Sequence, residues 1–258
     1  MIKRHNKIGF KQIVRIEWMN RALSLVLAGL PEKEIRNQLD TYLSTQQQRG
    51  GEGSIRNRAT YGMSIGLLSC WFREEPELEA FRQALLKQAK KLDQQHWLPL
   101  HWSMLVAAYP YFALVSETIG RLFFLQDVIS SGQIYDRMKQ SLGDKEMIAR
   151  NTRYVIRTLV SWGLLIEDFQ GQKGHYTEPC SYKLKNSECV ALLLEGLLLA
   201  LPEEKCEWFA LQRHKSLYGF EFEISSAQHL ERLSENRIVV SQLGLTTGMV
   251  AINKTMLK

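Results

Sequence analysis

The chain is poor in the residues that build metal centres and disulfide scaffolds. Its 258 residues include four cysteines and six histidines, and neither kind is clustered. No CxxC pair occurs, so the usual spacing of a zinc site is missing. Scattered free thiols are typical of proteins in a reducing compartment. We therefore expect no metal, no cofactor and a cytoplasmic location.

The sequence also contains no catalytic motif at a position where the surrounding helices and strands would allow it to function. No GxSxG, HExxH, GxGxxG or P-loop stands where its surrounding elements would make it credible, and the glycine-rich loop at 50–53 lacks the Gly-Lys-Ser/Thr ending. His96 and His101 flank Pro99 in an aromatic segment, and two histidines there could serve a metal or act as a base. A buried corner of the core explains them more simply. We expect that the protein is not an enzyme.

Long uninterrupted apolar runs are absent as well. Val190–Leu201 has twelve residues, about 18 Å as a helix, whereas a bilayer core needs roughly 30 Å. Met104–Leu125 is long enough but contains Pro110 and charged residues. The N-terminus is basic but has no apolar run of signal-peptide length. We interpret both runs as buried helices and expect neither export nor a membrane.

Positive charge is concentrated in the first quarter of the chain. The formal net charge is +6, and residues 1–66 hold eleven lysines and arginines against five acidic residues, which accounts for the whole excess. Such asymmetry favours an anionic partner, most often nucleic acid. The alternative is a solvated basic surface with a frayed tail.

A first candidate contact follows the glycine-rich loop. Ser54 is a favoured N-cap residue for a helix predicted to run through Phe72, and Arg56 and Arg58 fall in its first turns. Cations at that end oppose the helix dipole by some tenths of a kcal/mol each, so a bound anion would relieve the misfit. We predict that Ser54, Arg56 and Arg58 contact DNA, with solvated arginines as the alternative.

The segment 131–176 has the order of elements of a winged helix-turn-helix. A short helix, a turn at Gly143 and a longer basic helix are followed by two short strands with a glycine-rich tip. In the longer helix the apolar residues recur with a period near 3.6 and predict its inner face. They are Ile148, Val155, Ile156, Leu159 and Val160.

Three arginines of the longer helix form the second candidate contact. Arg150, Arg153 and Arg157 are three and four residues apart, so they share one side and can reach phosphates or guanine edges together. We predict that this helix lies in the major groove and that Lys173 at the wing tip touches the backbone. Winged helices also serve as protein-binding modules, and nearby acidic residues dilute the positive field, so protein contact is the alternative.

The pattern predicts a mainly α fold: a helical bundle with a central winged helix-turn-helix and a small C-terminal α+β appendage. We expect a basic N-terminal helical domain at 1–100, a helical spine plus the winged segment at 101–180, and a buried helix plus the appendage at 181–258. Strands are predicted at Tyr218–Ile224, Ile238–Val240 and Met249–Ile252.

The order of segments over residues 15–180 resembles the BrxA family, accessory proteins of bacterial BREX phage-exclusion systems. The matching stretches are LPEKEIRNQL, SIRNRATYGMSIGLL, the long apolar hairpin and ARNTRYVIRTLVSWGLL. The resemblance implies cytoplasmic binding of double-stranded DNA in phage defence, without catalysis, with Ser54, Arg56 and Arg58 and the three arginines of the basic helix at the matching positions. The strand-rich end after Leu201 departs from the family.

Two other functions stay open on the residues alone. One is a scaffold that docks onto larger catalytic defence proteins through the winged segment and the appendage. The other is a transcriptional repressor, which would need a symmetric dimer and a palindromic operator. The sequence contains no coiled-coil heptads for such a dimer and fixes no oligomeric state.

Overall fold

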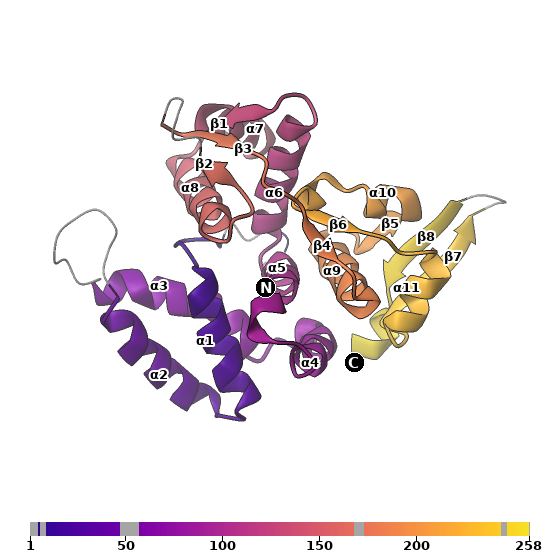
Figure 1. The fold of residues 1–258 in the computed structure, drawn as a ribbon, viewed down its shortest axis with the longest axis horizontal. Coiled ribbons are helices and arrows are strands. Elements are labelled where there is room, and N and C mark those ends of the chain that lie inside the picture. Colours follow the sequence, from indigo (N-terminus) through magenta and orange to yellow (C-terminus); the bar gives the residue numbers. More distant parts are fainter. Residues whose placement is uncertain (1–4, 6–8, 47–56, 168–172, 244–246, 258) are drawn as a thin grey trace.

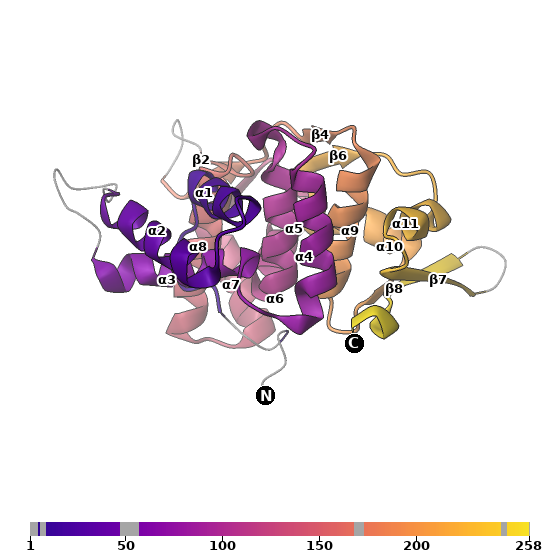
Figure 2. The same ribbon diagram turned by 90° about the horizontal axis from the view of Figure 1, so that it is seen from below.

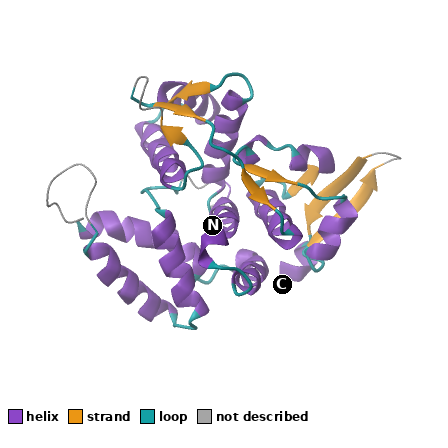
Figure 3. Cartoon of the chain, viewed as in Figure 1, coloured by secondary structure: helices purple, strands orange, loops and turns teal. Residues whose placement is uncertain are grey.

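The computed structural model describes residues 5, 9–46, 57–167, 173–243 and 247–257. The chain is mainly α-helical, as expected, and its strands form small sheets (Figures 1 and 3). The N-terminal helices lie on one side of a central group of helices, and most of the strands of the C-terminal part lie on the other.

The N-terminal helices are α1 (Ile16–Leu27), α2 (Glu32–Ser44) and α3 (Arg58–Leu68), followed by the 3-10 turn η2 (Ser69–Trp71). The predicted start of α3 at Ser54 is wrong: the helix begins at Arg58, and the side chain of Asn57 accepts a hydrogen bond from the amide of Ala59 at 2.8 Å. Asn57 therefore caps the helix.

The centre of the core consists of α4 (Pro76–Ala89), η3 (Gln94–His96), α5 (Leu98–Ala108), α6 (Pro110–Phe123) and α9 (Ser187–Ala200). Every residue of α9 from Cys189 onward is buried. A Cβ on Gly196 would lie 2.7 Å from the carbonyl oxygen of Ser103, so glycine permits α9 to approach α5 closely. The prediction of a buried helix is confirmed for the run Val190–Leu201, whereas the run Met104–Leu125 is buried over most of its length but ends in the exposed Phe124 and Leu125.

Helices α5 and α6 are bent by 114° where Tyr109 meets Pro110, in agreement with the expected break at the proline. Within the described ranges no single helix is long and apolar enough to cross a bilayer, and only the bent α5–α6 pair taken together has the necessary length and composition.

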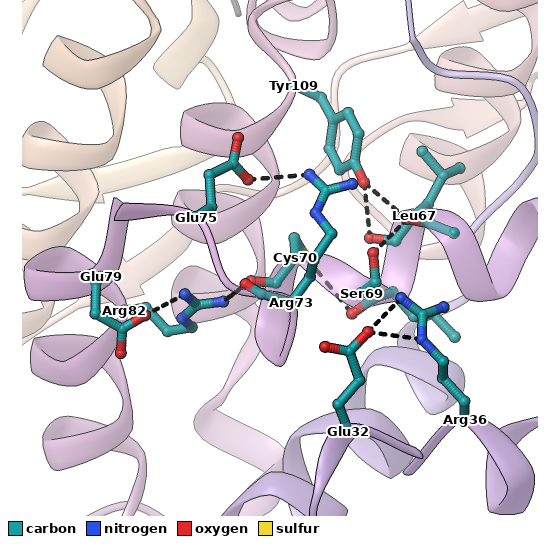
Figure 4. A network of polar contacts seen from close by, with 12 residues as sticks. Glu32, Arg36, Leu67, Ser69, Cys70, Arg73, Glu75, Glu79, Arg82 and Tyr109 are labelled. Atoms are coloured by element: carbon teal, nitrogen blue, oxygen red, sulfur yellow. Dashed lines mark hydrogen bonds and ion pairs between the residues drawn. The ribbon is translucent and has the colours of Figure 1, made fainter. Parts of the chain in front are cut away.

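A network of polar contacts joins the N-terminal helices to the central ones (Figure 4). The buried guanidinium of Arg82 on α4 donates hydrogen bonds to the carbonyl oxygens of Cys70 and Arg73. The hydroxyl of Tyr109 donates to the carbonyl oxygen of Gly66 at 3.0 Å. These bonds satisfy carbonyls near the end of α3, in η2 and just after η2, so they fix the position of the N-terminal helices relative to α4 and to Tyr109.

A three-stranded sheet packs beside the next two helices. It contains β1 (Val128–Ser130), β2 (Ile166–Glu167) and β3 (His175–Thr177), and the helices between β1 and β2 are α7 (Ser131–Leu142) and α8 (Glu146–Ser161). Strand β3 lies between the other two and is antiparallel to both.

The C-terminal part has two further sheets. In the first, β4 (Tyr182–Leu184) pairs in parallel with β6 (Phe220–Phe222). The second has the order β5 (Lys205–Glu207), β8 (Thr247–Ile252), β7 (Ile238–Leu243), so the two strands predicted near the C-terminus are confirmed. The helical elements of this part are α10 (Trp208–Gln212), η4 (Lys215–Leu217), α11 (Ala227–Leu233) and η5 (Lys254–Leu257).

Side chains from the helix preceding β7 cover part of its outer edge. The amide of Ile238 donates to Oγ of Ser234 at 3.1 Å, and the amide of Val240 donates to Oε1 of Glu231 at 3.0 Å. These amides are therefore not available to pair with another strand.

Candidate nucleic-acid interface

The candidate interface begins with a well-capped α7. Oγ of Ser130 accepts from the amide of Gln133 at 3.2 Å, and Oε1 of Gln133 accepts from the amide of Ser130 at 2.8 Å, a reciprocal capping box. At the other end Gly143 has φ of +88°, which a residue with a side chain rarely adopts. The predicted turn at Gly143 therefore separates α7 from α8.

The inner face of α8 is held at its N-terminal half by α6. Ile148, Val155, Ile156 and Leu159 are buried, as their spacing predicts, whereas Val160 of the predicted inner face is only partly buried. The hydroxyl of Tyr111 donates to the carbonyl oxygen of Ile148 at 3.0 Å and lies 2.7 Å from the hydroxyl of Thr152.

The C-terminal end of α8 is held by a segment from the beginning of the chain. The amide of Val14 donates to Oγ1 of Thr158 at 3.0 Å, and Nε1 of Trp162 donates to the carbonyl oxygen of Val14 at 2.9 Å. Because α8 is fixed at both ends, its outer face has one orientation relative to the rest of the molecule.

The three arginines lie on that outer face. Arg150, Arg153 and Arg157 are all exposed. In the part of the chain that the structure describes, no carboxylate lies within 4.0 Å of these guanidinium groups, whereas Lys139 on α7 pairs with Asp144 at 3.1 Å. Figure 1 shows α8 at the surface, between the β1-β3-β2 sheet and the N-terminal helices. A cationic stripe free of ion pairs can exchange its hydration for phosphate contacts.

Lys173 also lies at the surface, at the base of the hairpin between β2 and β3. Its side chain is exposed. The next residue, Gly174, has φ of +84°, and its carbonyl oxygen accepts a hydrogen bond from the amide of Ser131 at 2.8 Å. The hairpin is thereby tied to the start of α7. The tip residues 168–172 lie outside the described ranges.

The other predicted DNA contact, which consists of Ser54, Arg56 and Arg58, is separate from α8. Ser54 and Arg56 lie outside the described residues. Arg58 is the first residue of α3, its side chain is 85% exposed, and its Nε lies 3.9 Å from Oδ1 of Asp40. Figure 1 shows the start of α3 at the outer end of the N-terminal helices, apart from α7 and α8. The structure therefore does not bring Arg58 together with the arginines of α8.

The residues that could suggest catalysis have structural roles. Gly62–Gly66 has GxSxG spacing but lies inside α3, and its Ser64 is buried and donates to the carbonyl oxygen of Ile13 at 3.2 Å. A nucleophile elbow instead requires an exposed serine at a strand-to-helix turn. Within the described ranges, no group of three metal-ligating side chains occurs.

The two histidines near Pro99 differ in their surroundings. His96 is exposed. His101 is fully buried, and its Nε2 lies 2.8 Å from Oδ1 of Asn20, with the rings of Trp71 and Trp97 packed edge-on against the imidazole. Burial lowers the pKa of His101 to about 3. The neutral, enclosed imidazole of His101 is a core residue, as expected, but the expectation of a buried corner is wrong for the exposed His96.

The exposed face of α8 also carries an uncharged residue, which the search for positive charge in the sequence does not identify. Met147 is 38% exposed and lies three residues before Arg150, so it extends the arginine stripe toward the start of the helix. The spacing alone is the signal that would have found it.

No protein-family model matches the chain, and comparisons with curated proteins and with solved structures also find no match.

Proposed function

We propose that the chain is a non-enzymatic protein that binds double-stranded DNA, and that α6, α7, α8 and the β1-β3-β2 sheet act as a winged helix-turn-helix. Three features support this assignment. The helices are separated by a tight turn at Gly143, α8 is followed by an antiparallel hairpin, and β1 completes the sheet. The proposal depends most on the exposed face of α8, where Arg150, Arg153 and Arg157 have no acidic partner among the residues that the structure describes.

In the proposed complex, α8 lies in the major groove. The arginines contact phosphates or the O6 and N7 atoms of guanine, because the planar guanidinium can donate two parallel hydrogen bonds. Met147 offers an apolar contact for a thymine methyl group. Lys173 contacts the phosphate backbone from the hairpin, which positions the protein without reading sequence.

The resemblance to the BrxA family supports a cellular role for this binding. We propose that the protein is a cytoplasmic accessory of a bacterial phage-defence system and acts beside the catalytic proteins of that system. Arg58 supplies a separate cation for the DNA backbone on this proposal, together with Ser54 and Arg56.

The charge-reversal variant Arg153→Glu/Arg157→Glu tests the proposed binding surface. Retention of a random-sequence duplex in a gel-shift assay is expected to be lost, and the melting temperature is expected to stay within about 2 °C, because substitutions of exposed residues cost little stability. Lys90→Glu/Lys91→Glu is the matched control: it changes the net charge equally on exposed residues beyond the end of α4. Unchanged DNA retention by the α8 variant, or equal loss in the control, would refute the assignment.

A further inference from the structure

A second surface of the molecule carries exposed apolar side chains that DNA binding does not use. Phe124 and Leu125 follow α6 and are 72% and 71% exposed, the highest values among the large apolar residues of the described ranges. Phe209 on α10 is 51% exposed. Exposed aromatic residues that gather beside a hollow mark a binding surface more often than scattered ones.

Two adjoining hollows lie between α6 and α10, and we call them together the α6–α10 groove. One has a volume of about 410 Å³ and is lined by Phe124, Tyr218 and Phe222 among others. The other has a volume of about 410 Å³ and is lined by Phe209 and Arg121 among others. Both hollows share one wall, which consists of the cations Arg213 and Lys215 and of His214, whose pKa is lowered by burial.

The walls of the groove are held in place by tight packing. A Cβ on Gly120 would lie 1.8 Å from the carbonyl oxygen of Lys215, so α6 and η4 are in backbone contact. This contact places Nζ of Lys215 3.7 Å from the ring centre of Phe124. The hydroxyl of Tyr218 is buried and has no hydrogen-bond partner in the described part of the chain. The groove is therefore preformed, and the hydroxyl of Tyr218 remains a hydrogen-bond donor without an acceptor among the described residues.

Two unpaired cations of the groove favour an acidic ligand. Two of the carboxylates that line it are already engaged: Glu117 pairs with Arg121 at 2.6 Å, and Glu207 accepts hydrogen bonds from two amides of α10. The third carboxylate of the lining is Glu178. Arg213 is exposed and has no ion-pair partner among the described residues. The lining contains equal numbers of carboxylates and of arginines and lysines, but Arg213 and Lys215 have no carboxylate partner among the described residues, and they lie beside exposed aromatic rings.

We propose that the α6–α10 groove binds a segment of another protein in which acidic residues flank a large apolar side chain. The apolar side chain packs against Phe124 and Phe209, and the carboxylates pair with Arg213 and Lys215. Aromatic residues and arginine supply most of the binding energy at protein interfaces, and complementary charge sets the choice of partner. Duplex DNA fits this surface poorly, because its phosphate backbone offers no apolar anchor.

The groove lies on the other side of α6 from α8. Both views show α8 and α10 separated by α6 (Figures 1 and 2). A protein segment in the groove and a duplex on α8 can therefore be bound at once, which would let the chain connect DNA to a larger assembly.

Selection from a phage-displayed library of random dodecapeptides tests this proposal on the full chain. The bait is the wild-type protein, and the counter-selection uses the variant Phe124→Ser/Arg213→Glu/Lys215→Glu. The expected result is enrichment of peptides with aspartate or glutamate around leucine, phenylalanine or tryptophan. A synthetic peptide from the enriched pool is expected to bind about tenfold or more weakly to the variant. Lys185→Glu, an exposed cation that lines neither hollow, is the control and should leave the affinity unchanged.

Three outcomes would overturn the inference. The first is no enrichment over the variant, and the second is enrichment of basic or uncharged peptides. The third is a loss of duplex binding by the groove variant as large as that of Arg153→Glu/Arg157→Glu, because the groove would then belong to the DNA surface. If instead the α8 variant loses DNA and keeps the peptide, the two surfaces are independent, as the structure predicts.

Discussion

The hydroxyl of Tyr111 on α6 lies 2.7 Å from the hydroxyl of Thr152 on α8, deep in the interior. Together with the bond from Tyr111 to the carbonyl oxygen of Ile148, this contact fixes the rotation of α8 about its own axis. A helix rotated by one residue would turn its arginines about 100° away from their present direction. The presentation of the cationic face therefore depends on a buried contact between two helices.

Replacing Tyr111 with phenylalanine tests that contact. The substitution removes the hydroxyl and leaves Thr152 without this partner, so the free energy of unfolding is expected to fall by about 1–2 kcal/mol in urea titrations. Tyr42→Phe on α2 is the control, because no hydrogen bond of the Tyr42 hydroxyl occurs in the described part of the chain. Equal stability of Tyr111→Phe and wild type would show that the contact does not hold α8.

Gly120→Ala tests the contact between α6 and η4. The added Cβ would meet the carbonyl oxygen of Lys215 at 1.8 Å, and a backbone atom cannot move aside as a side chain can. We expect a loss of about 3 kcal/mol in the free energy of unfolding. In contrast, Gly62→Ala on the exposed face of α3 meets no atom within 4 Å and should be neutral or stabilising by up to about 1 kcal/mol. Similar effects of both alanines would contradict the packing described for the groove.

A buried ion pair connects the C-terminal sheet to the core. Nε and Nη2 of Arg237 donate hydrogen bonds to the two carboxylate oxygens of Glu195 on α9 at 2.8 and 3.1 Å. Burial raises the pKa of Glu195 to about 7, although Arg237 opposes the shift. The guanidinium of Arg237 therefore offsets part of the free-energy cost of burying the carboxylate of Glu195.

Removing one partner of this pair should be strongly destabilising. Arg237→Met leaves the carboxyl group of Glu195 buried without its cation and is expected to cost about 3–5 kcal/mol in chemical unfolding. Lys87→Met breaks the exposed pair between Lys87 and Glu235, whose side chains are both 61% exposed, and should cost less than about 1 kcal/mol. A small effect of Arg237→Met would mean that the sheet is held by apolar contacts alone.

His101 should make the fold sensitive to acid. Burial lowers its pKa to about 3, whereas the unfolded chain has a histidine pKa of about 6.5. Between these values the unfolded state binds the proton and the folded state does not, so stability is present above pH 6.5 and is lost as the pH falls. From pH 7.5 to pH 5 the loss due to His101 is about 2 kcal/mol.

The variant His101→Gln isolates that contribution. It cannot titrate, so its free energy of unfolding should vary less between pH 7.5 and pH 5 than that of the wild type, whatever its stability at either pH. His96→Gln, at an exposed position, is the control and should follow the wild type. If both variants show the wild-type pH dependence, the imidazole of His101 is accessible to protons in the folded state.

Much of this fold can be predicted from the spacing of apolar residues, because that spacing shows which face of a single helix or strand is buried. The inner face of α8 follows directly from apolar residues spaced near 3.6, and the break between α5 and α6 follows from Pro110. The start of α3 does not follow, because Ser54 and Asn57 are both favoured N-cap residues and residue type alone cannot choose between them.

Contacts between distant residues are not visible in the sequence. Val14 holds α8 through Thr158 and Trp162, and Arg237 neutralises Glu195, but no local pattern relates either pair of segments. The α6–α10 groove was missed for the same reason, because it combines Phe124 and Lys215 from elements far apart in the chain. Exposure could be predicted for the arginines of α8, since charged residues on an amphipathic helix face away from its apolar side.

The affinity for a random-sequence duplex as a function of salt concentration tests the central claim most directly. If the exposed cations neutralise four to six phosphates, log affinity should fall against log salt with a slope of roughly −4 to −5. Arg150→Gln/Arg153→Gln/Arg157→Gln should make the slope shallower by roughly three, about one for each arginine. A flat response of the wild type, or an unchanged slope in the triple variant, would show that α8 is not the surface that meets DNA.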